Sequence, residues 1–384
     1  MKSAIIAVVL LAIQFVGIQA QGLGKPGEQF GKGTVVLSAA RVIVGTGAAP
    51  IQDGIVVVKD NKIVEVGPKG SVSIPAGARR IELGDATLMP GFIDAHTHLI
   101  GRVLGDPDGQ NARFRDYNSF GAILSVRNAK RTLMSGFTTI RNVGAGNFDD
   151  LAIRKAINDG WIPGPRMLTA GHSLGITGGH CDTNGYKPGA VDGNFKTGIA
   201  DGVDQVRAAV RYQIKYGADV IKTCATGGVL SEGDAVGVQQ YSFAELKAMV
   251  DEAAQHERKV AAHAHGTEGI KVATRAGVAS IEHGSFLDAE GARLMRESGT
   301  YLVPTLMAGE AVENLTRKGF LKGHRGEKAL AAAAAMRNAI KIAVQNRVPV
   351  ALGTDSGVIP HGTNGREFRL MVEWGGMKPR GKSK

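Results

Sequence analysis

From residue 88 onward the chain alternates short apolar runs with helical stretches, and this rhythm constrains the fold more than any other feature. One helical stretch begins at Ser242 with Glu245 three residues later, the pattern of a capping box, and another covers the alanine-rich 329–345. Strands that alternate with helices predict a parallel sheet, and eight of them predict a closed (β/α)8 barrel of the α/β class over residues 89–377. The eight apolar runs that we expect to form strands are 88–96, 137–143, 166–170, 218–224, 259–264, 279–283, 301–306 and 348–354.

The first 88 residues follow other patterns. Residues 1–20 have a positive start at Lys2, an apolar stretch and a small residue, Ala20, before a cleavage point. They predict a secretory signal peptide, with an uncleaved anchor as the alternative, and hence an exported protein, periplasmic or secreted, without stable membrane insertion after cleavage. Residues 33–88 predict a small antiparallel sheet, because short β-branched runs alternate there with turn signals. Those runs are 34–37, 41–44, 54–58 and 62–66.

Residue types that bind metals stand where the expected barrel strands give way to loops. In a (β/α)8 barrel the carboxyl ends of the strands form the active site. Imidazoles, a lysine and an aspartate gathered there are the ligands of a hydrolytic site with two metal ions. The residues concerned are His96, His98, Lys222, His263, His265, His283 and Asp355.

Two pairs of histidines in this set are separated by a single residue, so both side chains of a pair face one side of a strand. We expect His96 and His98 to share one metal ion. We expect His263 to bind a second ion together with His283, which leaves His265 to face the substrate. Each histidine taken alone is more simply a core or surface histidine, so the hypothesis rests on their joint placement.

Lys222 and Asp355 complete the set. A lysine desolvated beside two cations loses its proton, and the free amine can add carbon dioxide to form a carbamate that bridges both ions. The alternative is a lysine at a strand end whose ammonium group reaches solvent. Asp355 can bind one ion and accept a proton from the attacking water, or it can merely cap the helix that follows.

Charge and composition narrow the class of partner. The net charge of +11 (46 basic and 35 acidic residues) is scattered, apart from a basic ending at 378–384. Without a basic stripe or interleaved aromatic residues, the pattern argues against nucleic-acid binding and leaves an affinity for anionic substrates or surfaces open. The partner that we expect is a small-molecule substrate. The sequence leaves a homo-oligomer open.

The segment 171–202 has nine glycines and little periodicity, which predicts a substrate lid, with a disordered insertion as the alternative. Near it, His172, His180 and Arg141 are candidates for binding a substrate carboxylate. Cys181 and Cys224 could pair in an oxidising compartment. We expect instead that Cys224 packs unpaired beside the strand that carries Lys222.

These motifs resemble the amidohydrolase superfamily, and within it the imidazolonepropionase-related group that includes exported Xaa-Pro dipeptidases and ochratoxin-type amidases. The resemblance implies two metal ions, usually zinc, with His96 and His98 on the first. It places His263 and His283 on the second, carboxylated Lys222 between them, and Asp355 as ligand and base. It also implies that Tyr241 polarises the scissile carbonyl, although this tyrosine could equally be an aromatic residue of a capping loop. The motifs that carry the resemblance are 90–98, 221–228, 262–266, 281–284 and 353–355.

The ending departs from the family. Members continue past the Trp374–Met377 region into strands that complete a sheet with the N-terminal strands, whereas here a divergent basic tail, 378–384, follows. We therefore expect a partial composite β-sandwich with an exposed edge. The predicted function is metal-dependent hydrolysis of the amide bond in dipeptides such as Xaa-Pro. Hydrolysis of cyclic amides, hydrolysis of aryl amides, and an inactive truncated product remain as alternatives.

Overall fold

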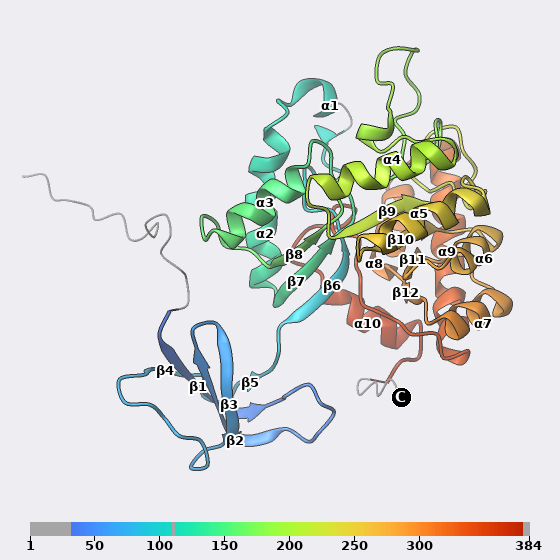
Figure 1. Cartoon of the computed structure of the whole chain (residues 1–384). Coiled ribbons are helices and arrows are strands. Elements are labelled where there is room, and N and C mark those ends of the chain that lie inside the picture. The colour runs from blue at the N-terminus through green and yellow to red at the C-terminus, as the bar shows by residue number, and fades with distance from the viewer. Residues whose placement is uncertain (1–31, 110–111, 379–384) are drawn as a thin grey trace, which may run out of the picture.

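The computed structural model describes residues 32–109 and 112–378, so the expected signal peptide and most of the basic tail lie outside the described residues. Within the described part, an N-terminal sheet lies apart from a larger α/β body, and the chain passes from one to the other just before β6 (Figure 1). Among the described helices, none is long and apolar enough to cross a membrane.

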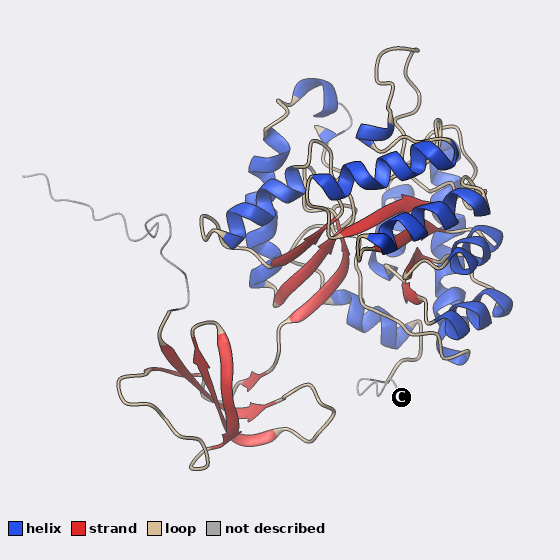
Figure 2. Cartoon of the chain, in the orientation of Figure 1, coloured by secondary structure: helices blue, strands red, loops and turns tan. Residues whose placement is uncertain are grey.

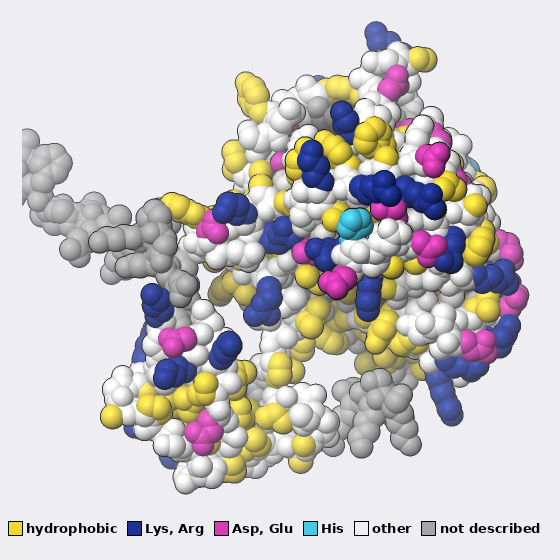
Figure 3. Space-filling view, in the orientation of Figure 1, with side chains coloured by type: hydrophobic (Ala, Val, Ile, Leu, Met, Phe, Trp, Pro, Cys, Tyr) yellow, Lys and Arg dark blue, Asp and Glu magenta, His cyan; other side chains and the backbone are white. Residues whose placement is uncertain are grey.

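The N-terminal sheet is mixed rather than purely antiparallel. The run 34–37 and the first two residues of the run 41–44 lie in one strand, β1, which pairs antiparallel with β2 on one side and parallel with β4 and β5 on the other. The edge strand β3 exposes 67% of Ile63 and 57% of Val64, and Figure 3 shows apolar side chains over this sheet. The strands are β1 (Thr34–Val42), β2 (Ile51–Lys59), β3 (Lys62–Pro68), β4 (Arg79–Glu82) and β5 (Thr87–Leu88).

The body contains seven of the eight expected barrel strands, all parallel, in two sheets of order β6-β7-β8 and β12-β11-β10-β9. Most bounds agree with the predicted runs to within two residues. These strands are β6 (Phe92–Thr97), β7 (Phe137–Asn142), β8 (Arg166–Thr169), β9 (Val220–Cys224), β10 (Lys259–Ala264), β11 (Ser280–His283) and β12 (Tyr301–Val303).

Two irregular seams join these sheets into the barrel. On one side, Leu174 forms a parallel bridge with Thr223 of β9. On the other side, the predicted eighth strand, 348–354, makes isolated bridges instead of a regular strand: Val350 pairs with Leu302, and Leu352 accepts a hydrogen bond from Ala95 of β6. The last expected strand is thus present in position but irregular in backbone.

Helices surround the strands (Figure 2). The capping box at Ser242 is confirmed, because its side chain accepts from the Glu245 amide and Glu245 accepts in return. The helices are α1 (Ala112–Arg115), α2 (Phe120–Met134), α3 (Asp149–Asn158), α4 (Gly202–Lys215), α5 (Phe243–Gln255), α6 (Thr267–Ala276), α7 (Ala289–Ser298), α8 (Leu306–Arg317), α9 (Gly323–Gln345) and α10 (Arg366–Glu373), with a 3-10 turn, η2 (Phe195–Thr197).

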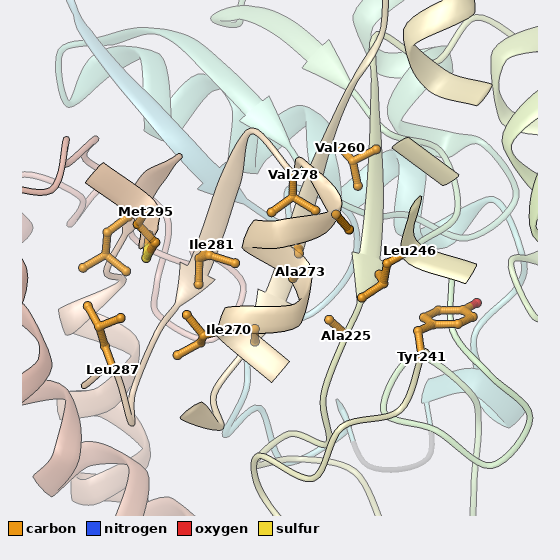
Figure 4. Close-up of a cluster of buried hydrophobic side chains, with 14 of the residues drawn as sticks. Ala225, Tyr241, Leu246, Val260, Ile270, Ala273, Val278, Ile281, Leu287 and Met295 are labelled. Carbon is orange, nitrogen blue, oxygen red and sulfur yellow. The ribbon is translucent and has the colours of Figure 1, made fainter. Parts of the chain in front are cut away.

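The main core lies between β9–β11 and the helices that cover them. Strand β9 is buried at all five positions, as expected for a parallel strand covered on both faces. Ile281 and Val260 from the strands pack with Leu246 and Ile270 from the helices (Figure 4). This packing fixes the strand ends that carry Lys222 and the later histidines.

Candidate metal centre

The six predicted ligands and His265, which we expected to face the substrate, converge. A cavity of about 600 Å³ opens at the carboxyl ends of the barrel strands, and all seven line it. They arrive from β6, β9, β10 and β11 and from the segment after Leu352, so residues up to 259 positions apart share one site. Two groups form within it: His96, His98 and Asp355, and His263, His265 and His283.

The first group meets around one carboxylate oxygen. Asp355 Oδ1 lies 3.5 Å from Nε2 of His96 and 3.6 Å from Nε2 of His98. The other ring nitrogens are already used: Nδ1 of His96 lies 2.7 Å from Glu282 Oε2, and Nδ1 of His98 lies 3.2 Å from the Gly144 carbonyl. Since a carboxylate and a carbonyl can only accept, both Nδ1 atoms carry the proton, and both Nε2 atoms keep a lone pair for a cation.

The second group is a compact set of rings. The centroid of His263 lies 4.6 Å from those of both His265 and His283. Nδ1 of His265 lies 2.6 Å from the Ser285 hydroxyl, and Nδ1 of His283 lies 2.7 Å from the Thr305 hydroxyl. Nε2 of His263 is buried without a hydrogen-bond partner. Such an orphaned nitrogen fits a residue meant to bind a cation.

Lys222 lines the same cavity as the two groups and is 97% buried. Burial lowers the pKa of its ammonium group from 10.5 to about 8, while Glu282 and Asp355 oppose the shift. Burial also lowers the pKa of His96, His98, His263 and His283, and it raises the pKa of Asp355. The imidazoles are therefore neutral near pH 7, the form that binds metals.

Two site residues have a backbone that side chains rarely adopt. His283 has a φ of 70° and Asp355 a φ of 61°, both in the left-handed region. Strain of this kind persists only where the surroundings enforce it, and it clusters at functional sites.

Asp94 of β6 connects the segments that carry His96 and Asp355. Its carboxylate accepts hydrogen bonds from the His96 amide at 3.1 Å and from the Thr354 hydroxyl at 2.6 Å. The turn that presents Asp355 is thereby tied to β6.

Known proteins share this architecture. A sequence model of the Amidohydrolase family matches residues 87–380. The chain belongs to the amidohydrolase family. It is 35% identical over 370 residues to an ochratoxinase from Aspergillus niger, covering 90% of this chain and 73% of that protein. A solved Xaa-Pro dipeptidase with bound methionine superposes with a TM-score of 0.83 at 37% identity, covering 89% of this chain and 84% of the other. A prolidase complexed with N-methylphosphonate-L-proline gives 0.79 at 32%, covering 89% and 83%.

The resemblance drawn from the motifs is confirmed, as is the barrel fold, and the chain is a hydrolase of carbon–nitrogen bonds. One residue that the resemblance implicated lies elsewhere. Tyr241 is fully buried in the main core, does not line the cavity, and donates its hydroxyl to the Ala200 carbonyl at 3.0 Å. The alternative of a structural aromatic residue describes it better, and we give it no role in the reaction.

The cysteines correct another expectation. Cys181 and Cys224 form a disulfide, with 5.9 Å between their Cα atoms, where we expected Cys224 to pack unpaired. The bond attaches the glycine-rich segment to the end of β9, and both cysteines line the cavity. Sequence spacing could not decide this, because the pairing depends on how the segment 171–202 folds back over the strand ends.

Of the three residues that we expected to bind a substrate carboxylate, one lines the cavity and two do not. His180 lines the cavity, its ring 4.3 Å from that of His263. His172 packs against Phe148, with ring centroids 4.7 Å apart and outside the cavity lining. Arg141 is also outside the lining, where it binds Glu282. The sequence gave Glu282, Ser285 and Thr305 no role; the one available signal was a carboxylate beside His283 in its motif.

Proposed function

We propose that this amidohydrolase is an exported two-metal enzyme that cleaves the amide bond of dipeptides of the Xaa-Pro type. The observation that carries the proposal is that two groups of three candidate ligands and a buried lysine line one cavity. Similarity to an Xaa-Pro dipeptidase and to a prolidase supports the substrate class. Histidine nitrogens with a carboxylate oxygen are donors that favour zinc.

His96, His98 and Asp355 would hold one ion, and His263 and His283 the other. Two divalent ions there would lower the pKa of a water molecule and polarise the scissile carbonyl. Neutral Lys222 would attack carbon dioxide through Nζ, forming an N–C bond and releasing a proton to solvent, and the oxygens of the resulting carbamate would help to hold the ions. Its lowered pKa supports this, because only the free amine can react.

Asp355 would take a proton from the attacking water and deliver it to the leaving nitrogen as the C–N bond breaks. Burial raises the pKa of this carboxyl group, which brings it closer to the range where one group can both accept and release a proton. His265 lies in the cavity beside His263 and His283, and we keep it as the histidine that faces the substrate. The geometry of the three rings also permits it to act as a ligand.

Hydrolysis of an aryl amide is the second candidate. The cavity extends beyond the ligands along an apolar wall that includes Val229, Val312 and Phe320. Such a wall suits a bulky apolar group, and the relative at 35% identity is an ochratoxinase. Cyclic amides remain as a third class to be tested.

Metal analysis joined to a substrate panel tests the proposal. The purified protein should contain close to two divalent ions per chain, and His96→Asn or His283→Asn should lower that content. The panel comprises Xaa-Pro dipeptides, aryl amides and imidazolonepropionate. Preference for the dipeptides supports the first candidate, and preference for the aryl amides supports the second. Full metal occupancy in both histidine variants would remove these residues from the site.

Export rests on residues 1–20, and the disulfide supports it because such bonds persist in oxidising compartments. N-terminal sequencing of the protein recovered from the periplasm or medium tests it. A mature start near residue 21 is expected, and retention of Met1 in a cytoplasmic fraction would contradict export.

A further inference from the structure

A carboxylate lies beneath the metal centre, outside the cavity. Glu282 of β11 is fully buried and does not line the cavity. Its Oε2 lies 2.7 Å from Nδ1 of His96, and its Oε1 accepts from Arg141 at 2.7 Å and from the Ser280 hydroxyl. Both carboxylate oxygens therefore bind groups within the barrel wall, and the side chain does not face the cavity that a substrate would enter.

Arg141, from β7, connects that carboxylate to the strand of its histidine. Besides Glu282, it binds the Ala95 carbonyl at 2.6 Å and the Ser280 hydroxyl at 3.1 Å. Ala95 immediately precedes His96 on β6. One guanidinium group thus fixes both the carboxylate and the backbone next to the ring that the carboxylate orients, across three separate strands.

We propose that Glu282 and Arg141 are positioning residues that hold His96 in the one tautomer able to bind a metal ion. The inference rests on the proposed two-metal function. Glu282 can only accept from Nδ1, so Nε2 of His96 keeps its lone pair facing Asp355. Partners of this kind orient the ligands of metal sites and tune their affinity. Arg141 acts through Glu282, by holding Oε1 and leaving Oε2 for the histidine.

Glu282→Gln tests this with almost no change of shape. Arg141 and Ser280 donate, so the amide oxygen must face them and the amide NH2 group must face His96. Nδ1 would then have to accept, and its proton would move to Nε2, the atom needed for the ion. We expect the affinity for one of the two ions, measured by chelator competition with Zn²⁺, to fall about 10- to 100-fold. The absorption spectrum of the Co²⁺-loaded protein should change for that ion as well.

Glu252→Gln is the matched control, because Glu252 is also a buried glutamate paired with an arginine, Arg211, but lies on α5 away from the site. It should leave both metal affinities and the Co²⁺ spectrum unchanged, whatever it does to the melting temperature. If the wild-type protein binds two ions and Glu282→Gln binds them equally well, the positioning role is wrong while the two-metal proposal stands. If the wild-type protein binds none, both are wrong.

Removing the arginine in the same background separates positioning from general stability. In Arg141→Met/Glu282→Gln the side-chain amide no longer has to turn its oxygen to a guanidinium, so it can turn the oxygen to His96. We expect the double variant to bind the affected ion more tightly than Glu282→Gln alone, although it loses another buried contact. An affinity lower than that of Glu282→Gln would show that Arg141 does not act through Glu282.

Discussion

The two groups of candidate ligands in this cavity are held by different chemistry. In the first, His96 and His98 donate to a carboxylate and to a backbone carbonyl, which can only accept. In the second, His265 and His283 face the hydroxyls of Ser285 and Thr305, which can donate or accept. The first group therefore has its protonation pattern imposed on it, whereas the second can adjust. The identity of the ligands alone therefore does not describe such a site, because the hydrogen-bond partners behind the rings decide which ring nitrogen carries the proton.

Lys222 lies outside both groups but lines the same cavity, and as the proposed carbamate it would serve both ions, so its replacement should have the largest effect. Lys222→Ala should abolish hydrolysis and lower the content of both ions, and short carboxylic acids should restore part of the activity by replacing the carbamate. Lys222→Arg should fail as well, since a guanidinium group stays protonated and cannot add carbon dioxide. The checks are turnover and metal content. Near-normal turnover in Lys222→Arg would rule out the carbamate.

A substitution at Asp355 tests whether the first group supplies a proton acceptor as well as metal ligands. Asp355→Asn keeps an oxygen for the metal but loses the proton acceptor, so turnover should fall by roughly 10²-fold or more, the scale of general-base loss. Most of the metal should remain bound. Steady-state kinetics with metal analysis of the same sample measures both. Unchanged turnover would reduce Asp355 to the cap of a turn.

The disulfide supports the second group, because Cys224 is the register partner of His263 across β9 and β10. Replacing both cysteines, Cys181→Ala/Cys224→Ala, should lower the free energy of unfolding by about 2–4 kcal/mol, the usual range for a native disulfide. Denaturant unfolding measures this, and the same loss should follow when the wild-type protein is reduced. Equal stability of both proteins in oxidising buffer would mean that the bond does not form.

The hydroxyl partners should give the smallest effects and separate the roles within the second group. Thr305→Val and Ser285→Ala each remove one hydrogen bond, worth about 1 kcal/mol. If His283 binds a metal and His265 faces the substrate, Thr305→Val should weaken metal binding several-fold, whereas Ser285→Ala should change KM or kcat alone. The reverse pattern would exchange the two histidines.

The sequence by itself determined the barrel and predicted a set of candidate ligands. Seven of the eight apolar runs form strands, because short, mostly apolar runs suit strands that are covered on both faces. Strand β9 is buried at all five positions even though it includes Lys222 and Thr223. The six candidate ligands and His265 stand at the ends of those runs and line one cavity. The eighth run lies where the last barrel strand was expected but is not a regular strand, since Val350 makes an isolated bridge and Leu352 a single hydrogen bond to the neighbouring strands.

Only the tertiary structure decided which residues support the ligands. Tyr241 lies outside the cavity, where its hydroxyl donates a hydrogen bond to the Ala200 carbonyl. Cys181 forms a disulfide with Cys224 because a long segment folds back over β9. Glu282 gained its importance from His96, which lies 186 positions away. Strand patterns are local, because each follows from which face of a short segment is buried. Hydrogen-bond partners are not, because they depend on which strands the closed barrel brings together.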